Sequence, residues 1–158
     1  MNKKMSALLQ RAGLRWPVEA LTISRPLPAL EIFEDCVLLK DQWDPNKHVK
    51  IAECFDRTGF ECFINHVHLP FDGTNQTLIS CLEYVATLQQ TLMPLTDRRF
   101  RVIVSLSEDD ESPKFACTVR FHQIRPGEDW IEEDIEGYKS EAMLVFDVPS
   151  LPQPSLEA

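Results

Sequence analysis

An apolar repeat at helical spacing between residues 76 and 93 is the clearest pattern in this sequence. Its apolar members recur every three or four positions and share one face of a helix, while Thr and Gln fill the other face. They are Leu78, Leu82, Val85, Leu88 and Leu92. Pro94 comes next and cannot continue a helix. The pattern predicts a long amphipathic helix over about residues 76–93.

Other runs predict the strands of an antiparallel sheet. Residues 100–106 and 115–121 alternate apolar and polar side chains, and the residues between these runs are polar and acidic. Such alternation is typical of strands with one buried face, so the two runs predict a hairpin with an exposed loop. Residues 141–148 predict a last strand. Residues 60–69, which are rich in Phe, Val and Ile and end before Pro70, predict another.

The remaining segments are shorter and less regular. Apolar residues within 5–14 indicate a short helix that ends near Gly13. Asp44 followed by Pro45 places a capping carboxylate before a Pro in a first turn, which favours a helix over residues 45–56. Residues 29–43 fit either a short helix or a pair of strands. Residues 129–137 fit a helix of one or two turns.

Taken in order, these elements predict an α+β fold. The helix of about residues 76–93 would pack on one face of the antiparallel sheet. The 158 residues, 44% of them hydrophobic, suit one domain with a buried core. We therefore expect a single domain over residues 1–148 and a flexible Pro-rich tail over residues 149–158.

The acidic residues are unevenly distributed. Four of the 25 Asp and Glu form the run 108–111, and six more lie between residues 128 and 136. The remaining fifteen nearly balance the 16 Lys and Arg, so the net charge of −9 belongs to two short segments. Phosphate backbones and anionic lipids need clustered basic residues. The sequence therefore predicts no nucleic-acid partner and no membrane partner.

Cysteine usage and the length of apolar runs indicate the compartment. The five Cys are widely spaced and form no CxxC pair, which is typical of reduced and mostly buried thiols. No stretch approaches the roughly 20 apolar residues of a membrane span. The apolar stretch that follows Met-Asn-Lys-Lys is too short for a signal peptide. We therefore expect a cytoplasmic protein.

Motifs of catalysis are missing from the sequence. It lacks GxGxxG, GxxxxGK[ST], GxSxG and HExxH, and it holds only five Gly for phosphate-binding loops. His66 and His68 lie two apart on a predicted strand, with Cys62 on the same face, and imidazoles so spaced can share a metal. No neighbouring residue completes such a site. The sequence therefore predicts no enzyme, no catalytic residue, no metal and no cofactor.

The acidic segment around Trp130 is the strongest candidate for a functional surface. An aromatic anchor within a charged ring is a common hot-spot arrangement, and dense carboxylates attract a basic partner. The predicted contact set is Glu128, Asp129, Trp130, Glu132, Glu133 and Asp134. The hairpin loop would supply a second patch of Asp109, Asp110 and Glu111. In the simpler alternative, Trp130 and its apolar neighbours attach a short helix to the core while the carboxylates face water.

The C-terminal part of the chain resembles the immunity proteins of bacterial polymorphic toxin systems, including those of contact-dependent growth inhibition. The resemblance covers about residues 98–148, with the hairpin Arg99–Ile124, the acidic segment Arg125–Asp134 and the closing strand Ala142–Val148. Those families share small size, acidity and a lack of catalytic motifs. The resemblance implies a single-domain inhibitor that binds one cognate toxin domain, often a nuclease, and blocks it.

Two further functions stay open at the level of sequence. A small cytosolic hydrolase or metal-dependent enzyme could assemble its site from His66, His68 and His122 on the sheet. A homo-oligomeric accessory protein would need no chemistry at all. The oligomeric state, the identity of the toxin, and whether binding covers its active site or a distant surface are also open.

Overall fold

A four-stranded antiparallel sheet forms the centre of the computed structural model, which describes residues 1–17, 23, 25–107 and 117–149. Its strands lie in the order β3 (His66–Leu69), β5 (Cys117–Gln123), β4 (Phe100–Ser107) and β6 (Glu141–Val148). The described chain is α+β with antiparallel strands, as the sequence predicts. The hairpin of β4 and β5 and the last strand are confirmed, with Val104 opposite both Val119 and Leu144.

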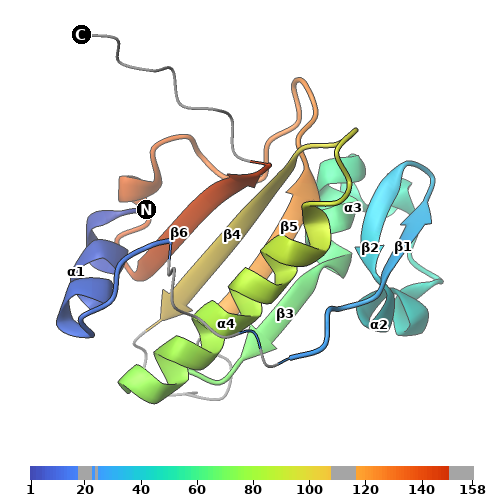
Figure 1. Ribbon diagram of the computed structural model, residues 1–158. Helices are drawn as coiled ribbons and strands as arrows, with labels where there is room; N and C mark the ends of the chain where they lie inside the picture. The colour runs from blue at the N-terminus through green and yellow to red at the C-terminus, as the bar shows by residue number, and fades with distance from the viewer. Residues whose placement is uncertain (18–22, 24, 108–116, 150–158) are drawn as a thin grey trace, which may run out of the picture.

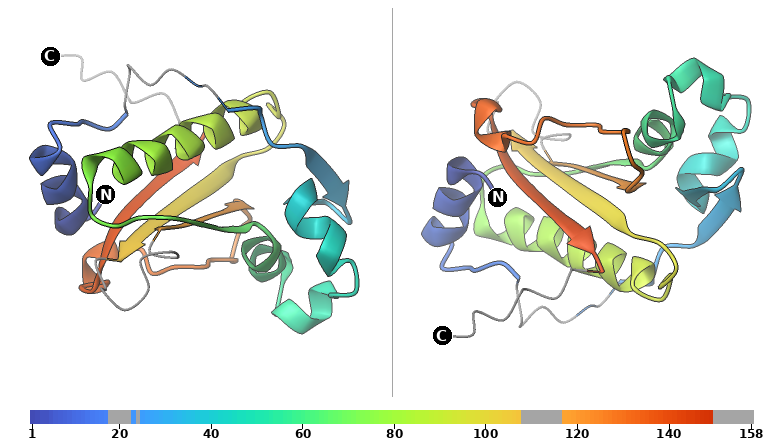
Figure 2. Two further views of the ribbon diagram at one scale, coloured as in Figure 1. Left: turned by 90° about the horizontal axis from the view of Figure 1, so that it is seen from below. Right: turned by 90° about the horizontal axis from the view of Figure 1, so that it is seen from above.

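Helix α4 (Asn75–Leu92) lies along one face of this sheet (Figures 1 and 2). Its buried side chains join alternate residues of β4, β5 and β6 in the main core. Thr74 caps its N-terminus by accepting a hydrogen bond from the Thr77 amide. Only Asn75, Gln76 and Gln90 of its 18 residues are exposed. Most of the Thr and Gln residues expected on the other face are therefore only partly exposed or buried, so the amphipathic character predicted for this helix is not confirmed.

The prediction of a strand over residues 60–69 is wrong in its first half. Residues Arg57–Ile64 form helix α3, which begins at the Asp56 cap, and only His66–Leu69 is a strand. Phe60 and Ile64, one helical turn apart, both pack into a second core cluster. A short apolar run fits a helical period as well as a strand, and here burial against the neighbouring hairpin selects the helix. Cys62 consequently lies on α3, and it does not share a sheet face with His66.

Three other segments differ from expectation or resolve an alternative. The helix expected over residues 45–56 is two separate 3-10 turns, Asp44–Asn46 and Ile51–Cys54. The segment 129–137 contains a single 3-10 turn, Ile135–Gly137, in place of an α-helix. Residues 29–43 contain a strand pair, and its members are β1 (Leu30–Phe33) and β2 (Cys36–Leu39), followed by the four-residue helix α2 (Lys40–Trp43).

Two buried side chains of α3 join the small β1–β2 sheet to the large one. Glu61 accepts hydrogen bonds from the Val37 amide of β2 at 2.8 Å and from the Gln123 amide of β5 at 2.7 Å. Asn65, one turn later, accepts from the Leu39 amide and donates to the carbonyl of Phe121 on β5. These polar side chains satisfy backbone groups that no strand pairs, so α3 and both sheets form one packed unit.

The other outer strand of the large sheet, β6, carries helix α1 (Lys3–Arg11) beside it (Figure 1). Asn2 caps α1 by accepting a hydrogen bond from the Met5 amide, and the same oxygen accepts one from Met143 on β6. The Asn2 amide donates to the Met143 carbonyl at 3.0 Å. The first described residues of the chain are therefore tied to the start of the last strand.

Two further findings bear on the sequence predictions. None of the helices in the described ranges is long and apolar enough to cross a membrane. All five Cys are free thiols, and burial raises the pKa of Cys36 to about 12, with the charge of Glu61 acting in the same direction. The predicted tail lies outside the described residues from position 150 onward.

Candidate functional site

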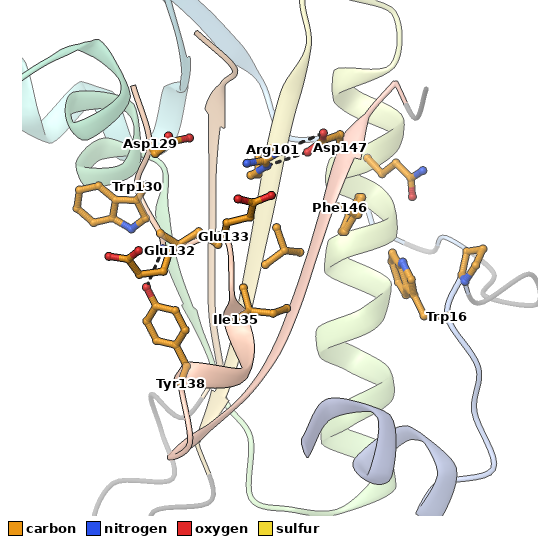
Figure 3. Close-up of a pocket in the computed structure, with 14 residues that line it drawn as sticks. Trp16, Arg101, Asp129, Trp130, Glu132, Glu133, Ile135, Tyr138, Phe146 and Asp147 are labelled. Carbon is orange, nitrogen blue, oxygen red and sulfur yellow. Dashed lines mark hydrogen bonds and ion pairs between the residues drawn. The ribbon is translucent and has the colours of Figure 1, made fainter. Parts of the chain in front are cut away.

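An open groove of about 1370 Å³ lies at the outer edge of β6 (Figure 3). Strand β6 lies in its middle, with Val145, Phe146 and Asp147 in the lining. On one side stand residues from the N-terminal segment and α4. They are Trp16, Pro17 and Gln89. On the other side runs the acidic segment, so the groove has an aromatic wall and an acidic wall.

The start of the acidic segment is anchored to α3 through a tight turn. Gly127 has φ +75°, in the left-handed region that favours Gly, and Arg125 pairs with Glu128 across the turn. Arg125 forms an ion pair of 2.8 Å with buried Glu61. Glu128 accepts hydrogen bonds from the amide and the hydroxyl of Thr58, in the first turn of α3. Both ends of the turn are therefore held by the same helix.

The far end of the segment is held by backbone hydrogen bonds around the 3-10 turn. The amide of Glu132 donates to the Tyr138 hydroxyl at 3.1 Å, and Asp134 caps the turn by accepting from the Glu136 amide. Glu136 in turn accepts from the amide of Lys3 at 2.9 Å. The residues between these anchors follow no regular structure, yet they have a defined place over the sheet.

Trp130 lies between the two anchors, over the sheet face opposite α4. Its side chain is 43% exposed, and the guanidinium carbon of Arg120 lies 5.9 Å from the centroid of its ring. A cation over an indole face is attracted by the ring quadrupole. Arg120 also donates to the Nε2 atom of His66 at 3.0 Å. The indole is thus supported from below, while nearly half of it remains available to a partner.

Asp147 on β6, at the floor of the groove, makes two ion pairs. Arg101 on β4 contacts it at 2.9 Å, and Arg99, just before β4, contacts it at 3.4 Å. The hydrogen bonds to Asp147 raise the pKa of Arg101, and the charges of Asp129 and Glu133 act in the same direction. Four carboxylates and one guanidinium line the groove, because Glu132 joins the three acidic residues just named. The lining side chains therefore carry a net negative charge even with Arg101 among them.

The structure brings together part of the predicted contact set. Asp129, Trp130, Glu132 and Glu133 line the groove. Glu128 instead turns inward to Thr58, and Asp134 caps the 3-10 turn. Ile131 and Ile135 are partly buried, but neither belongs to a core cluster and the segment forms no α-helix, so the short helix of the simpler alternative is not found. The second predicted patch, Asp109, Asp110 and Glu111, lies outside the described residues.

Sequence reasoning missed the residues that complete the groove. Trp16 lies more than a hundred positions before the acidic segment and packs against Phe146, with ring centroids 5.0 Å apart and the ring planes tilted by 46°. No local pattern links these two positions. Arg101 has a weak signal in the sequence, because it is a polar member of an alternating strand. Asp147 interrupts a nearly continuous apolar run, and the strand register places it opposite Arg101.

The three His considered for an enzyme share one sheet face but differ in access. The rings of His66 and His68 have centroids 4.2 Å apart, whereas His122 is 2% exposed. Burial lowers the pKa of His122, and the same cause lowers the pKa of His66 to about 4, with Arg120 and His68 adding to the effect on His66. Within the described part of the chain, no group of three or more metal-ligating side chains occurs.

The lowered pKa of His66 gives a prediction for stability against pH. The unfolded chain protonates this residue near its ordinary value of 6.5, and the folded chain only near 4. Between these values the unfolded state binds more protons, so stability falls as pH falls. For this half-exposed group the loss is about 1 kcal/mol after solvent screening. Urea unfolding of wild type and His66→Gln at pH 7 and pH 4.5 measures it.

Carboxylates also titrate between pH 7 and pH 4.5. The measure of the His66 effect is therefore the difference in stability loss between wild type and His66→Gln. We expect His66→Gln to lose less stability on acidification than wild type does. His48→Gln, at an exposed position, is the matched control and should follow wild type. Equal losses in wild type and His66→Gln would show that His66 carries no proton linkage.

Comparison with known proteins adds a family to this description. Residues 1–154 match the model of the Uncharacterized protein PM0498 family. No curated protein and no solved structure matches the chain significantly. The match spans nearly the whole chain, and it therefore includes Trp16, the acidic segment and all of β6.

Proposed function

The chain belongs to the Uncharacterized protein PM0498 family, and we propose that it neutralises a toxin by binding the toxin domain through the groove beside β6. The observation that carries the proposal is the acidic wall of this groove with a half-exposed Trp130 at its centre. The resemblance to immunity proteins supplies the biological class. The partner is accordingly a basic protein domain, and a nuclease is the class with a surface of that charge.

The electrostatics of the groove favour capture of a basic partner. Asp129, Glu132 and Glu133 project from a segment that is fixed at both ends, so their negative charge has a fixed direction. Charges arranged in this way raise association rates, and salt reduces the effect. A bound partner would be excluded from its own substrate by the bulk of the inhibitor. No chemistry by the inhibitor is required for this mechanism.

If the proposal holds, the position of the gene identifies the partner toxin. An immunity gene lies directly downstream of a large toxin gene whose C-terminal domain varies. Co-expression of this chain with that C-terminal domain should restore growth to cells that the domain alone kills. Survival without the chain, or death despite it, would reject the pairing. A mixture of the two purified proteins should then elute as one complex in size-exclusion chromatography.

Reversal of the groove charge should slow formation of this complex. In the double variant Glu132→Lys/Glu133→Lys, the association rate constant is expected to fall by roughly tenfold or more at low salt, because steering accounts for at least that factor. The difference should shrink as salt rises toward 1 M, where the Debye length is only about 3 Å. Stopped-flow fluorescence of Trp130 against salt concentration provides the measurement.

The matched control carries the same change in charge at the other side of the molecule. Glu34 and Asp41 are exposed near the β1–β2 hairpin, which lies beyond β3, the outer strand opposite β6 (Figure 1). Glu34→Lys/Asp41→Lys should slow association far less than the groove variant does. Equal slowing by both double variants would mean that only net charge matters. No slowing by the groove variant at any salt concentration would reject the acidic face.

A further inference from the structure

The outer edge of β6 has backbone groups that point away from the sheet. Both the amide and the carbonyl of Met143 bond to Asn2, on the side away from β4. In an antiparallel sheet, groups that point to the same side recur at every second residue. The amides and carbonyls of Val145 and Asp147 therefore point outward as well, while those of Leu144 and Phe146 point toward β4.

These outward groups lack partners among residues 1–17, 23, 25–107 and 117–149. Asn2 and α1 cover the edge at Met143, and no hydrogen bond from the described chain reaches the outward amides or carbonyls of Val145 and Asp147. Both residues line the groove. A row of unpaired backbone groups at a sheet edge is a template for another strand. The groove therefore contains a ready edge for strand addition.

The two walls of the groove differ in chemistry along this edge. On the α4 side, Trp16 packs against Phe146. On the opposite side, Asp129, Glu132 and Glu133 form the acidic wall (Figure 3). An added strand would direct successive side chains to opposite faces of the sheet. Alternate residues of the added strand would thus contact aromatic rings, and the residues between them would face carboxylates.

We propose that the open edge of β6 accepts an extended segment of a partner protein as a fifth strand, and that this segment alternates apolar and basic residues. Main-chain hydrogen bonds to Val145 and Asp147 would provide affinity, and the two walls would provide specificity. This inference relies on the proposed function only for the partner being basic. The strand mode itself depends on the edge and the two walls.

Charge decides between this occupant and a second copy of the chain. Two β6 edges paired by a twofold axis would place the acidic walls of both copies on the same face, close to the shared edge. Like charges opposite one another across paired strands are destabilising. A basic segment has the opposite effect, because it neutralises the exposed carboxylates of Asp129, Glu132 and Glu133.

Synthetic heptapeptides test the proposal directly on the full-length protein. The probe is Val-Lys-Val-Lys-Val-Lys-Val, and its comparators replace Lys by Glu, or keep the composition but group the Lys residues together. Nuclear magnetic resonance of the ¹⁵N-labelled protein reports the amides of Val145 and Asp147 one by one. We expect both amides to shift and to become protected from hydrogen exchange with the alternating Lys peptide. We expect at least tenfold weaker binding of the two comparators.

Binding of the alternating Lys peptide should be lost when the backbone hydrogen bonds are blocked, either on the protein or on the peptide. Val145→Pro removes one outward amide, and Pro is tolerated at such positions on outer strands because no sheet hydrogen bond is lost. Val145→Thr keeps the amide and is the matched control. If Val145→Pro fails to fold, a probe peptide with N-methyl groups on two adjacent residues blocks both of its edges and gives the same answer on the unchanged protein.

The outcomes separate the two proposals. Equal binding of the alternating and grouped Lys peptides, unaffected by N-methylation, would overturn strand addition and leave the acidic face intact. If binding depends on the open edge but the Lys and Glu peptides bind equally well, β6 accepts a strand. The basic partner of the proposed function would then be rejected. Protection of both amides without peptide would overturn the proposal in favour of another occupant. Light scattering would then identify a dimer, and deletion of residues 150–158 would identify the tail.

Discussion

Glu61→Ala should lower the free energy of unfolding by about 3–5 kcal/mol, the range found when one partner of a buried ion pair is removed. Glu61 is fully buried and forms an ion pair with Arg125, whose side chain is nearly buried too. Its two oxygens also accept the amides of Val37 and Gln123. The truncation would leave a buried guanidinium and two backbone amides without their acceptor.

The size of this effect follows from the position of Glu61 in the fold. Burial alone would lower the pKa of Arg125, but the hydrogen bonds and the charge of Glu61 raise it, so the guanidinium stays charged inside the protein. Removal of Glu61 takes that compensation away. A loss of this size corresponds to a melting temperature lower by roughly 6–20 °C for a chain of this length.

Thermal and urea unfolding, followed by circular dichroism, measure the loss. Glu61→Gln is the informative companion, because its amide keeps one acceptor oxygen and removes the charge. We expect Glu61→Gln to fall between wild type and Glu61→Ala. A change below 1 kcal/mol for Glu61→Ala would mean that water replaces the carboxylate and that the junction between the two sheets contributes little stability. The same junction anchors the turn at Gly127, so binding by the groove should weaken in parallel.

The sequence predicted the parts of the fold in which a single period is strong. The alternation in residues 100–106 and 115–121 identified β4 and β5, because one face of each strand meets the core and the other is less buried. The sequence prediction failed at residues 57–64, because a short apolar run there fits the period of a helix as well as that of a strand. The choice of a helix there depends on Glu61 and Asn65, which bond to strands more than twenty residues away. Such contacts leave no trace in local sequence.

The candidate site was predictable to the extent that it is local. Trp130 and the carboxylates beside it are neighbours in sequence, and four of them also share the groove. Trp16 and Phe146 meet only because α1 and the chain after it return to the edge of β6. Glu128 was wrongly predicted as part of the contact surface. In the structure it accepts a hydrogen bond from Thr58 at the start of α3.

Trp130→Ala should weaken binding to the toxin domain by roughly thirtyfold or more, since hot-spot truncations exceed about 2 kcal/mol. The indole lies at the centre of the acidic wall, is held over Arg120, and is 43% exposed, so a partner can bury the remainder. The loss should appear mainly in the dissociation rate, in contrast to the association effect of Glu132 and Glu133. Titration calorimetry and surface-based kinetics measure the two effects separately.

Stability and a second aromatic residue provide the controls for this result. The contact of Trp130 with Arg120 contributes only about 0.5–1 kcal/mol at an exposed site, so the variant should remain folded. Trp130→Phe should recover part of the affinity, because a smaller ring still fills the same place. Phe55 is fully exposed and does not line the groove, so Phe55→Ala tests whether any exposed aromatic ring matters. If Phe55→Ala weakens binding and Trp130→Ala does not, the partner binds elsewhere, and the acidic groove then has no part in recognition.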